Sequence, residues 1–395
     1  MSAAPILPGA TIGIVGGGQL GRMFALEARR MGYRVVVWDP GADAPAALVA
    51  DEAITAPFDD PEAARELARR SDVVTLEWEN ADVATLRELE AGAPVRPGPA
   101  VLEVAQHRLS EKDAARRLGV PTAEYRAVRS LPELHAALDA VGTPAVLKTS
   151  RGGYDGKGQA VIRDPAEAEA AFRSVAPEGT ELILEAFVRF RMEISVVVAR
   201  SATGEVACFP VGENDHRGGI LHSTVVPARI SAGLADEARR IARVLAEGLD
   251  VVGLLAVEMF VGDDGVIRMN EIAPRPHNSG HYTWEACPVS QFEQQLRAVC
   301  GLPLGAVDLL RPAAMVNLMG DDVGTGVGRA GTAEALRVHT VALHLYGKAE
   351  SRPGRKMGHL TALGASADEA LERAQRAWNS LAANVDSGAL APAAE

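Results

Sequence analysis

The feature that most constrains the fold is an alternation of short apolar runs and helical patterns between Thr11 and about Pro97. The predicted strands read TIGIV, RVVVW, EAIT and DVVTL, and a helix reading QLGRMFALEARRMG, which ends at Gly32, separates the first two. Strands that alternate with helices indicate βαβ units and a parallel sheet. The sequence therefore predicts a parallel-sheet domain over residues 1–100, closed by the Pro/Gly-rich stretch PVRPGPA.

The turn after the first predicted strand has the spacing Gly16-x-Gly18-x-x-Gly21, and Asp39 ends the second strand. In Rossmann-like domains this pattern binds a dinucleotide, because the glycines admit the pyrophosphate and the acid binds a ribose. The helix that follows the glycines also suits another anion at its N-terminus. An oxidoreductase or a dinucleotide-binding regulatory module would depend on this motif alone, and an NAD titration tests it.

Composition restricts the class of partner. The net charge is −12 and the sequence pI is about 5.3, whereas proteins that bind nucleic acid or anionic membranes are usually basic. Cys208, Cys287 and Cys300 have no metal-ligand spacing, and the start MSAAPILPGA lacks the pattern of a signal peptide. We expect a cytoplasmic protein with reduced thiols and with no nucleic-acid or membrane partner.

Two further helices have recognisable start signals. In SEKDAARRLGVP, Ser110 is the expected N-cap and Gly119 the expected end. Near the C-terminus, Ser366 and Glu369 have the spacing of a capping box. Strands dominate the chain between these two helices.

The length of 395 residues is too great for one compact core and fits two or three domains. After the parallel-sheet domain we expect a strand-rich domain over residues 101–305. A smaller domain over residues 306–395 follows.

The loop TSRGGYDGKGQ joins two predicted strands, PAVLK and QAVIR. Its four glycines allow backbone N–H groups to approach phosphate oxygens, and its lysine adds a positive charge. The strand–loop–strand order differs from the strand–loop–helix order of a P-loop. The loop itself leaves two interpretations open, a phosphate site and a flexible hairpin.

The strands LLAVEMF and VIRMNEI are separated by VGDDG. If Asp264 and Gly265 form a two-residue turn, Glu258 stands directly opposite Glu271, with Cβ atoms about 5 Å apart on one face. Like charges in this position destabilise a hairpin unless a cation neutralises them, and carboxylates suit Mg²⁺ shared with nucleotide phosphates. The alternative is a slipped register with two exposed acids.

Two clusters of basic and polar residues follow. The stretch IAPRPHNSGH places Arg275, His277 and Asn278 directly after the second of these acids, and an arginine can bind phosphate or carboxylate with two hydrogen bonds. Lys348 and RPGRKMGH form a basic cluster near the C-terminus. Either cluster could be solvated surface, or could concentrate an anionic substrate.

Six stretches, in order, resemble those of ATP-grasp enzymes and, within them, the N5-carboxyaminoimidazole ribonucleotide synthetases of purine biosynthesis. They read GGGQLGRM, GYDGKGQ, ENDHRGGILHSTVVPA, NEIAPRPHNSGH, SQFEQQLRAVCG and YGKAESRPGRKMGHL, and they cover nearly the whole chain. One departure is His107, where the family often has Asp before the residue equivalent to Arg108.

The resemblance implies a mixed α/β and α+β fold: an ATP-grasp domain, an N-terminal Rossmann-like pre-ATP-grasp domain and a small C-terminal domain. It implies that ATP and bicarbonate are used to carboxylate 5-aminoimidazole ribonucleotide to N5-carboxyaminoimidazole ribonucleotide, giving ADP and phosphate, with carboxyphosphate as the expected intermediate. It further implies Mg²⁺, no biotin, and a homodimer. In this family the first domain helps to hold the ribonucleotide and does not bind NAD.

The resemblance also assigns residues to an ATP and metal site. Lys148 would meet the phosphates, the backbone of EAFV would read adenine, Glu193 would hold the ribose, and Glu258 and Glu271 would bind Mg²⁺. The residues expected at ATP are Arg108, Lys148, Gly153, Tyr154, Asp155, Gly156, Lys157, Gly158, Gln159, Glu185, Ala186, Phe187, Val188, Glu193, His216, Asn270 and Glu271.

A second set would hold bicarbonate, carboxyphosphate and the ribonucleotide. Asp155 would contact the reacting amine, and Arg275, His277 and Asn278 would act as the other catalytic residues. The expected substrate-binding residues are Gln19, Glu77, Tyr154, Arg275, His277, Asn278, Lys348, Arg355 and Lys356.

Two related enzymes are alternatives. A formate-dependent glycinamide ribonucleotide transformylase has the same fold and an RPGR-type cluster, but HNSGH and SQFEQ favour the carboxylating enzyme. A biotin carboxylase fits less well because the chain has no Met-Lys-Met biotin site.

Overall fold

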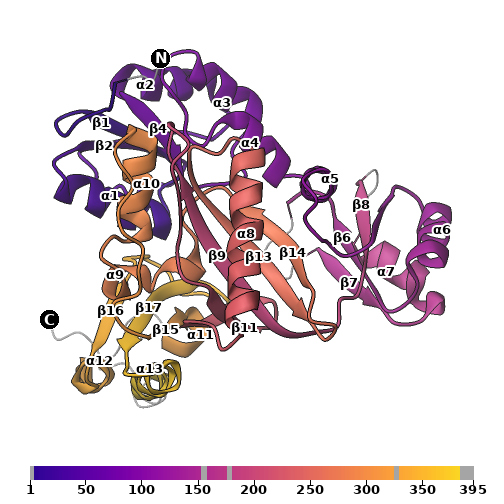
Figure 1. Ribbon diagram of the computed structural model, residues 1–395. Helices are drawn as coiled ribbons and strands as arrows, with labels where there is room; N and C mark the ends of the chain where they lie inside the picture. The colour runs from indigo at the N-terminus through magenta and orange to yellow at the C-terminus, as the bar shows by residue number, and fades with distance from the viewer. Residues whose placement is uncertain (1–3, 153–157, 176–179, 324–328, 383–395) are drawn as a thin grey trace, which may run out of the picture.

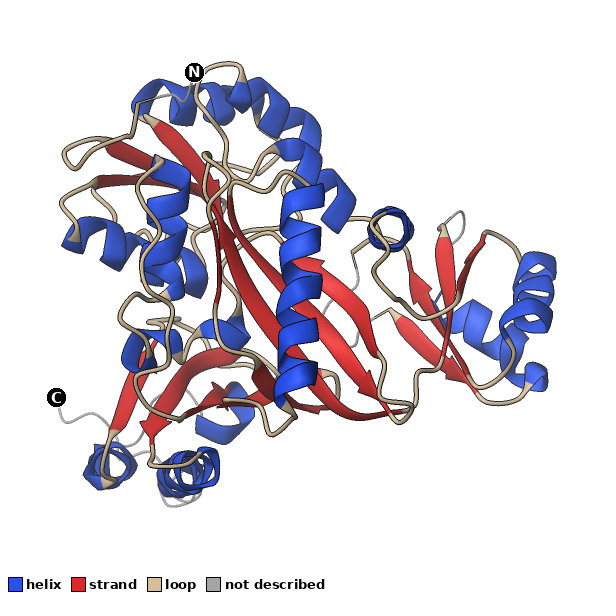
Figure 2. Ribbon diagram, in the orientation of Figure 1, coloured by secondary structure: helices blue, strands red, loops and turns tan. Residues whose placement is uncertain are grey.

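The computed structural model describes residues 4–152, 158–175, 180–323 and 329–382. Three sheets organise the molecule: a parallel sheet near the N-terminus, a small antiparallel sheet that projects to one side, and a long antiparallel sheet (Figure 1, Figure 2). The predicted mixed α/β and α+β fold class is confirmed. Within the described ranges no helix is both long enough and apolar enough to span a membrane.

The N-terminal sheet has the order β3-β2-β1-β4, and all its pairings are parallel. Its four strands match the four predicted apolar runs to within one residue. Helices cover both faces, which explains why β1, β2 and β4 are mainly apolar, whereas β3 at one edge of the sheet is mostly exposed. Its elements are β1 (Thr11–Val15), α1 (Gln19–Arg30), β2 (Arg34–Asp39), β3 (Glu52–Thr55), α2 (Pro61–Arg70), β4 (Val73–Leu76), α3 (Val83–Glu90) and α4 (Pro99–Ala105).

The small sheet has the order β5-β8-β6-β7 and is antiparallel. Leu147 and Leu184 face the helices α6 and α7 in a buried core. Because side chains alternate across a strand, Lys148 and Glu185 lie on the opposite face. The elements of this region are α5 (Arg108–Arg117), β5 (Tyr125–Val128), α6 (Leu131–Val141), β6 (Ala145–Thr149), β7 (Gln159–Ile162), η1 (Pro165–Glu167), α7 (Ala168–Val175) and β8 (Leu182–Ala186).

The long sheet has the order β14-β13-β9-β11-β12-β15-β17-β16, with β10 paired to β9. Strands from both sides of residue 305 belong to it, so the C-terminal strands extend the sheet of the preceding domain (Figure 1). Its strands are β9 (Phe190–Arg200), β10 (Val206–Cys208), β11 (Gly212–Arg217), β12 (Ile220–Val226), β13 (Gly253–Gly262), β14 (Ile267–Ala273), β15 (Ala313–Met319), β16 (Val341–Leu345) and β17 (Lys356–Leu363).

Helices pack on both faces of the long sheet and connect it to the first sheet. The core formed by α1 and the N-terminal strands also contains Phe292, Leu296 and Val299 of α10, so this helix joins the two regions. The helices are α8 (Ala232–Gly248), η2 (Asn278–Gly280), α9 (Thr283–Ala286), α10 (Gln291–Cys300), α11 (Gly320–Val323), α12 (Arg329–Arg337) and α13 (Ala367–Ala382).

The β13–β14 hairpin pairs Glu258 with Glu271, as the sequence predicted, but for a different reason. The turn is one residue longer than expected, because the Gly262 N–H donates to the Val266 carbonyl at 3.0 Å. The register then shifts at the bulge that contains Asn270, between the Met259–Met269 pair and the Glu258–Glu271 pair. The longer turn and the bulge offset each other, so the predicted pairing is right and the predicted two-residue turn is wrong.

The two predicted helix starts have different outcomes. Helix α5 begins at Arg108, and its N-cap is His107, whose Nδ1 accepts from the Ser110 N–H at 3.3 Å. The prediction that Ser110 caps this helix is therefore wrong. Before α13, Ser366 Oγ accepts from the Glu369 N–H at 3.2 Å, and the Glu369 carboxylate accepts from the Ala365 N–H at 2.6 Å, which confirms the capping box.

Candidate active site

Two acidic side chains occupy the glycine turn of the N-terminal sheet. The Gly17 N–H donates to Asp39 Oδ2 at 2.7 Å, and the Gly18 N–H donates to Glu77 Oε2 at 3.0 Å. A Cβ atom at Gly16 would lie 2.5 Å from Glu77 Oε2, and φ at Gly16 is +101°. Glycine is thus required here by the packing of an acid against the turn. Carboxylates at these N–H groups oppose the binding of a pyrophosphate, so the geometry disfavours a dinucleotide site.

Cations line the face of the small sheet that carries Lys148. Lys148 Nζ lies 3.1 Å from Glu185 Oε2, and Lys112 Nζ of α5 lies 3.7 Å from the same oxygen. Burial alone would raise the pKa of Glu185, but the charges of Lys112, Lys148 and Arg108 outweigh it and lower the pKa to about 2. Glu185 is therefore ionised, and the two lysines are held in fixed positions around it.

Helix α5 also connects these cations to the long sheet. Lys112 Nζ donates to the Asn270 carbonyl at 2.6 Å, Glu111 Oε1 accepts from the Ile272 N–H at 2.6 Å, and Arg108 Nη1 lies 3.1 Å from Glu271 Oε2. Burial raises the pKa of Glu111 to about 8, although the charges of Lys112 and Arg108 oppose this shift. These contacts fix β14 against the face that carries Lys148.

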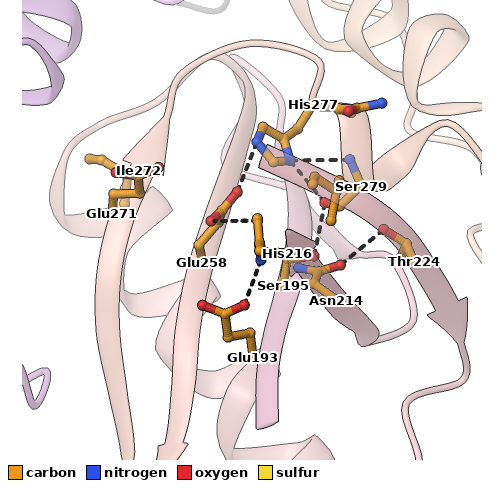
Figure 3. A network of polar contacts seen from close by, with 12 residues as sticks. Glu193, Ser195, Asn214, His216, Thr224, Glu258, Glu271, Ile272, His277 and Ser279 are labelled. Carbon is orange, nitrogen blue, oxygen red and sulfur yellow. Dashed lines mark hydrogen bonds and ion pairs between the residues drawn. The ribbon is translucent and has the colours of Figure 1, made fainter. Parts of the chain in front are cut away.

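A chain of polar contacts crosses the long sheet from β9 to the loop after β14 (Figure 3). Glu193 Oε2 lies 2.5 Å from His216 Nδ1, and His216 Nε2 lies 4.0 Å from Glu258 Oε2. Glu258 Oε1 lies 3.0 Å from His277 Nε2, and His277 Nδ1 lies 2.8 Å from Ser279 Oγ. Burial would raise the pKa of Glu258, but the hydrogen bond and charge of His277 outweigh it and lower the pKa.

The loop that carries Arg275, His277 and Asn278 is fixed by residues of other elements. Gln291 Oε1 accepts from the His277 N–H at 2.9 Å, and Gln291 Nε2 donates to the His277 carbonyl at 2.8 Å. Arg275 Nη2 lies 2.6 Å from Glu79 Oε2, which connects the loop to the N-terminal domain.

The C-terminal basic cluster lies near Glu77 of the N-terminal glycine turn and near Glu258 of β13. Lys348 Nζ donates to the Lys356 carbonyl at 2.8 Å. Burial, together with the charges of Arg355 and Lys356, lowers the pKa of Lys348 to about 8, although the charge of Glu77 opposes this shift. The charge of Lys356 also contributes to the low pKa of Glu258. The basic cluster is therefore close to the acid of the N-terminal turn and to the acid of β13.

Three family models match successive parts of the chain. They describe a ribonucleotide synthetase preATP-grasp domain (residues 9–106), an ATP-grasp domain (residues 113–292) and a phosphoribosylaminoimidazole carboxylase C-terminal domain (residues 313–373). The N5-carboxyaminoimidazole ribonucleotide synthase of Bacillus subtilis (strain 168) is 48% identical over 378 residues, which cover 96% of this chain and 98% of that protein. The chain belongs to the N5-carboxyaminoimidazole ribonucleotide synthase family.

Solved structures of this family agree with the assignment. One is an ADP complex of an N5-carboxyaminoimidazole ribonucleotide synthetase, 47% identical, with a TM-score of 0.90 and coverage of 96% of this chain and 100% of that one. Another is the Aspergillus clavatus enzyme in complex with ADP and 5-aminoimidazole ribonucleotide, 31% identical, with a TM-score of 0.87 and coverage of 94% and 98%. The chain is an ATP-dependent ligase with the ATP-grasp fold, and purine biosynthesis is its pathway.

The structure brings most of the residues predicted for this synthase family close together. Arg108, Lys148, Glu185 and Glu271 belong to the contacts around α5, and Glu193, His216, Glu258 and His277 belong to the chain in Figure 3. Gln19 begins α1, beside the turn that Glu77 occupies. The predicted residues Gly153, Tyr154, Asp155, Gly156 and Lys157 lie outside the described residues.

The backbone N–H groups after β8 differ in whether they have a hydrogen-bond partner. The Ala186 N–H donates to the Glu124 carbonyl at 2.7 Å, and the Phe187 N–H donates to the Pro144 carbonyl at 3.1 Å. In the described part of the chain no partner is seen for the Val188 N–H. Gly158 has φ +70° and Gln159 pairs with Lys148, so the last two residues of the predicted phosphate loop lead into β7 beside Lys148.

The donor set at Glu258 and Glu271 fits a hard cation. Both side chains offer carboxylate oxygens, and Asn270 Oδ1 is buried without a hydrogen-bond partner. Among the described residues, no group of three or more His, Cys, Asp or Glu side chains could hold a metal. These residues therefore fit Mg²⁺ only together with other oxygen ligands, such as nucleotide phosphates.

Sequence reasoning missed several residues of this site. Glu79, Glu111, Lys112 and Gln291 each contact a residue predicted to be functional or the strand that carries it. Glu111 and Lys112 are only 2% and 1% exposed, which is unusual for charged residues. Their burial depends on β14, more than 150 residues further along the chain, so no local pattern indicates it.

Proposed function

We propose that this chain uses ATP and bicarbonate to carboxylate 5-aminoimidazole ribonucleotide to N5-carboxyaminoimidazole ribonucleotide, with release of ADP and phosphate. The observation that carries the proposal is the proximity of two differently charged regions. Glu258 lies between His216 and His277 and is influenced by the charge of Lys356. A phosphoryl donor held by the acids and an anionic acceptor held by the basic cluster would thus meet at one place.

ATP binds between the small sheet and the long sheet in this proposal. Lys148 and the glycine loop contact its phosphates, the free Val188 N–H contacts adenine, and Glu193 accepts hydrogen bonds from the ribose hydroxyls. The hydrogen bond of 2.5 Å between Glu193 and His216 supports this role, because it orients the carboxylate.

Glu258 and Glu271 would hold Mg²⁺, and Asn270 Oδ1 would offer a further oxygen ligand. When bound, it would neutralise charge on the transferred phosphoryl group. Arg108 is paired with Glu271 and lies beside Glu185, so it is placed to contact the same phosphates.

Bicarbonate attacks the γ-phosphorus of ATP, and the products are carboxyphosphate and ADP. Arg275, His277 and Asn278 face the bicarbonate and carboxyphosphate oxygens. Arg275 and Asn278 hold these oxygens through N–H donors, whereas the ring of His277 is bonded to Glu258 and Ser279. The amine of the ribonucleotide then forms a C–N bond with the carboxyl carbon, directly or after release of CO₂, and phosphate leaves. We assign contact with the amine to Asp155 and Tyr154.

The ribonucleotide phosphate binds to Lys348, Arg355 and Lys356, and Gln19 and Glu77 contribute from the first domain. The division into residues 1–100, 101–305 and 306–395 corresponds to these roles: the middle unit binds ATP, and the outer units bind the ribonucleotide. We further propose a homodimer in the cytoplasm that needs neither biotin nor a nucleic-acid or membrane partner.

Phosphate release from ATP tests this function. We expect release to require Mg²⁺ and to increase when bicarbonate and 5-aminoimidazole ribonucleotide are both present. Stimulation by formate and glycinamide ribonucleotide instead would support the transformylase. Release that none of these substrates changes would contradict the proposal.

A further inference from the structure

Asn278 is paired with a buried asparagine from the C-terminal part of the long sheet. Asn278 Nδ2 donates to Asn317 Oδ1 at 3.0 Å, and Asn317 Nδ2 donates to Asn278 Oδ1 at 2.6 Å. Asn278 is 7% exposed and Asn317, on β15, is fully buried. Two amides joined by a pair of reciprocal hydrogen bonds hold each other in one plane and one orientation.

The Leu221 carbonyl determines which orientation this is. Asn317 Nδ2 also donates to the Leu221 carbonyl at 2.7 Å. A carbonyl can only accept, so the NH₂ group of Asn317 must face it, and the oxygen of Asn317 must face Asn278. If the amide of Asn278 were reversed, two NH₂ groups and two oxygens would face each other. The backbone of β12 thus fixes the amide of Asn278 through Asn317.

The pair leaves one donor on Asn278. Its NH₂ group has two hydrogens, and in the described part of the chain only Asn317 accepts from it. Asn317, in contrast, uses both hydrogens of its NH₂ group. Asn278 directly follows His277, whose ring contacts Glu258, so the remaining N–H belongs to the loop that faces the reacting groups.

We infer that Asn317 is a positioning residue that keeps the N–H of Asn278 directed at an anionic oxygen of bicarbonate or carboxyphosphate. This inference rests on the proposed function. Without Asn317, the amide of Asn278 could rotate and present its oxygen to the anion, which would be repulsive. Asn317 itself contacts no reacting atom in this account, and it acts only through Asn278.

A double-mutant cycle tests this role, because a residue that acts only through Asn278 loses its effect when Asn278 is absent. The four proteins are the wild type, Asn317→Ala, Asn278→Ala and the double variant. We expect Asn317→Ala to raise the Michaelis constant for bicarbonate about tenfold, the loss of about one hydrogen bond to an anion. In the Asn278→Ala background, Asn317→Ala should change the Michaelis constant for bicarbonate less than about twofold. The Michaelis constant for ATP should be the same in all four proteins.

Gln294→Ala is the matched control for the loss of a buried amide. Gln294 is fully buried in α10, and its amide forms two hydrogen bonds with the backbone of Gly305, with distances of 2.8 and 3.0 Å. This control should lower the melting temperature as Asn317→Ala does, yet leave the bicarbonate constant unchanged.

Three results would overturn the inference. They are an equal effect of Asn317→Ala in both backgrounds, no effect in either, and an equal rise in the bicarbonate constant for Gln294→Ala. Failure of the proposed function is separate, because it would appear in the wild type as phosphate release that does not depend on bicarbonate.

Discussion

Two regions of this chain have sequences that suggest a phosphate site, and their side chains differ in charge. The N-terminal turn has the glycine spacing of a dinucleotide site, but Asp39 and Glu77 already accept hydrogen bonds from its N–H groups. The small sheet has a less specific glycine loop, but Lys112 and Lys148 surround Glu185 beside it. The comparison shows that glycines permit a close approach to the backbone, whereas the neighbouring charges decide what approaches.

The same contrast separates the two ends of the proposed active site. Acids at Glu258 and Glu271 need a cation before they can accept a nucleotide phosphate. Lys348 and Arg355 can bind a phosphate directly. Each end can therefore be weakened separately, and the predictions below follow from this separation.

The largest effect is expected at the acidic end. Glu271→Gln keeps the size of the side chain but removes one charge from the proposed Mg²⁺ site, so turnover should fall by about a hundredfold or more. Steady-state kinetics at several Mg²⁺ concentrations measure this loss.

Stability provides the control for this variant. The like-charge pair alone suggests that Glu271→Gln stabilises the protein, but Glu271 is paired with Arg108, so we expect no gain in melting temperature. Asp264→Asn, at the exposed end of the same hairpin, should keep normal turnover. Normal turnover of Glu271→Gln at ordinary Mg²⁺ would remove Glu271 from the metal site.

A smaller, selective effect is expected at the basic end. Each charge-assisted contact to the phosphate contributes about 1.5–3 kcal/mol. Arg355→Ala should therefore raise the Michaelis constant for 5-aminoimidazole ribonucleotide by roughly ten- to a hundredfold and leave that for ATP nearly unchanged. Added salt should likewise weaken the binding of the ribonucleotide, because it screens the charges of the phosphate and the basic cluster. If Arg355→Ala raises the Michaelis constant for ATP alone, the two substrates are assigned to the wrong ends of the active site.

The glycine turn can be tested for packing without any ligand. A Cβ at Gly16 would lie 2.5 Å from Glu77 Oε2 and 2.8 Å from the Trp78 nitrogen, at a positive φ. Gly16→Ala should lower the free energy of unfolding by about 1–3 kcal/mol in chemical denaturation. Gly119→Ala also has a positive φ but no atom within 4 Å, so it should cost less. Equal losses would argue against a packing role for Glu77.

The pH dependence should also differ between the two ends. The pKa of Lys348 is about 8, because burial and the neighbouring cations disfavour its charged form. A lysine is charged only below its pKa, so kcat/KM for the ribonucleotide should fall about tenfold per pH unit above pH 8. In Arg355→Ala this fall should begin at higher pH, since one repelling charge is gone. A fall in kcat/KM for ATP alone would contradict this assignment.

The smallest effect is expected for NAD. Because carboxylates occupy the N-terminal turn, calorimetric titration with NAD or NADP should give no saturable heat. Mg·ATP is the positive control under the same conditions. Saturable binding of either dinucleotide would remove the difference between the two regions.

Much of the fold could be predicted because local sequence determines it. Three of the four N-terminal strands, β1, β2 and β4, are buried on both faces, so each forms an apolar run that stands out from its surroundings. The capping box at Ser366 and Glu369 is also local. The pairing of Glu258 with Glu271 was predicted although neither the bulge nor the longer turn was.

The rest depends on contacts between distant parts of the chain. His107 caps α5 while its other ring nitrogen lies 2.8 Å from Glu181, so its role needs a partner 74 residues away. Lys112 becomes part of the site only because β14 lies against α5. Asn317 has no motif around it, and its contact with Asn278 exists only in the folded sheet.

The most direct test of the central claim is a crystal structure of this protein with Mg·ADP and 5-aminoimidazole ribonucleotide. The account predicts adenine beside the Val188 N–H, the ADP ribose at Glu193, and a cation held by Glu258 and Glu271. The ribonucleotide phosphate should contact Lys348 and Arg355. ADP phosphates bound at the N-terminal glycine turn, between Gly16 and Gly21, would contradict it.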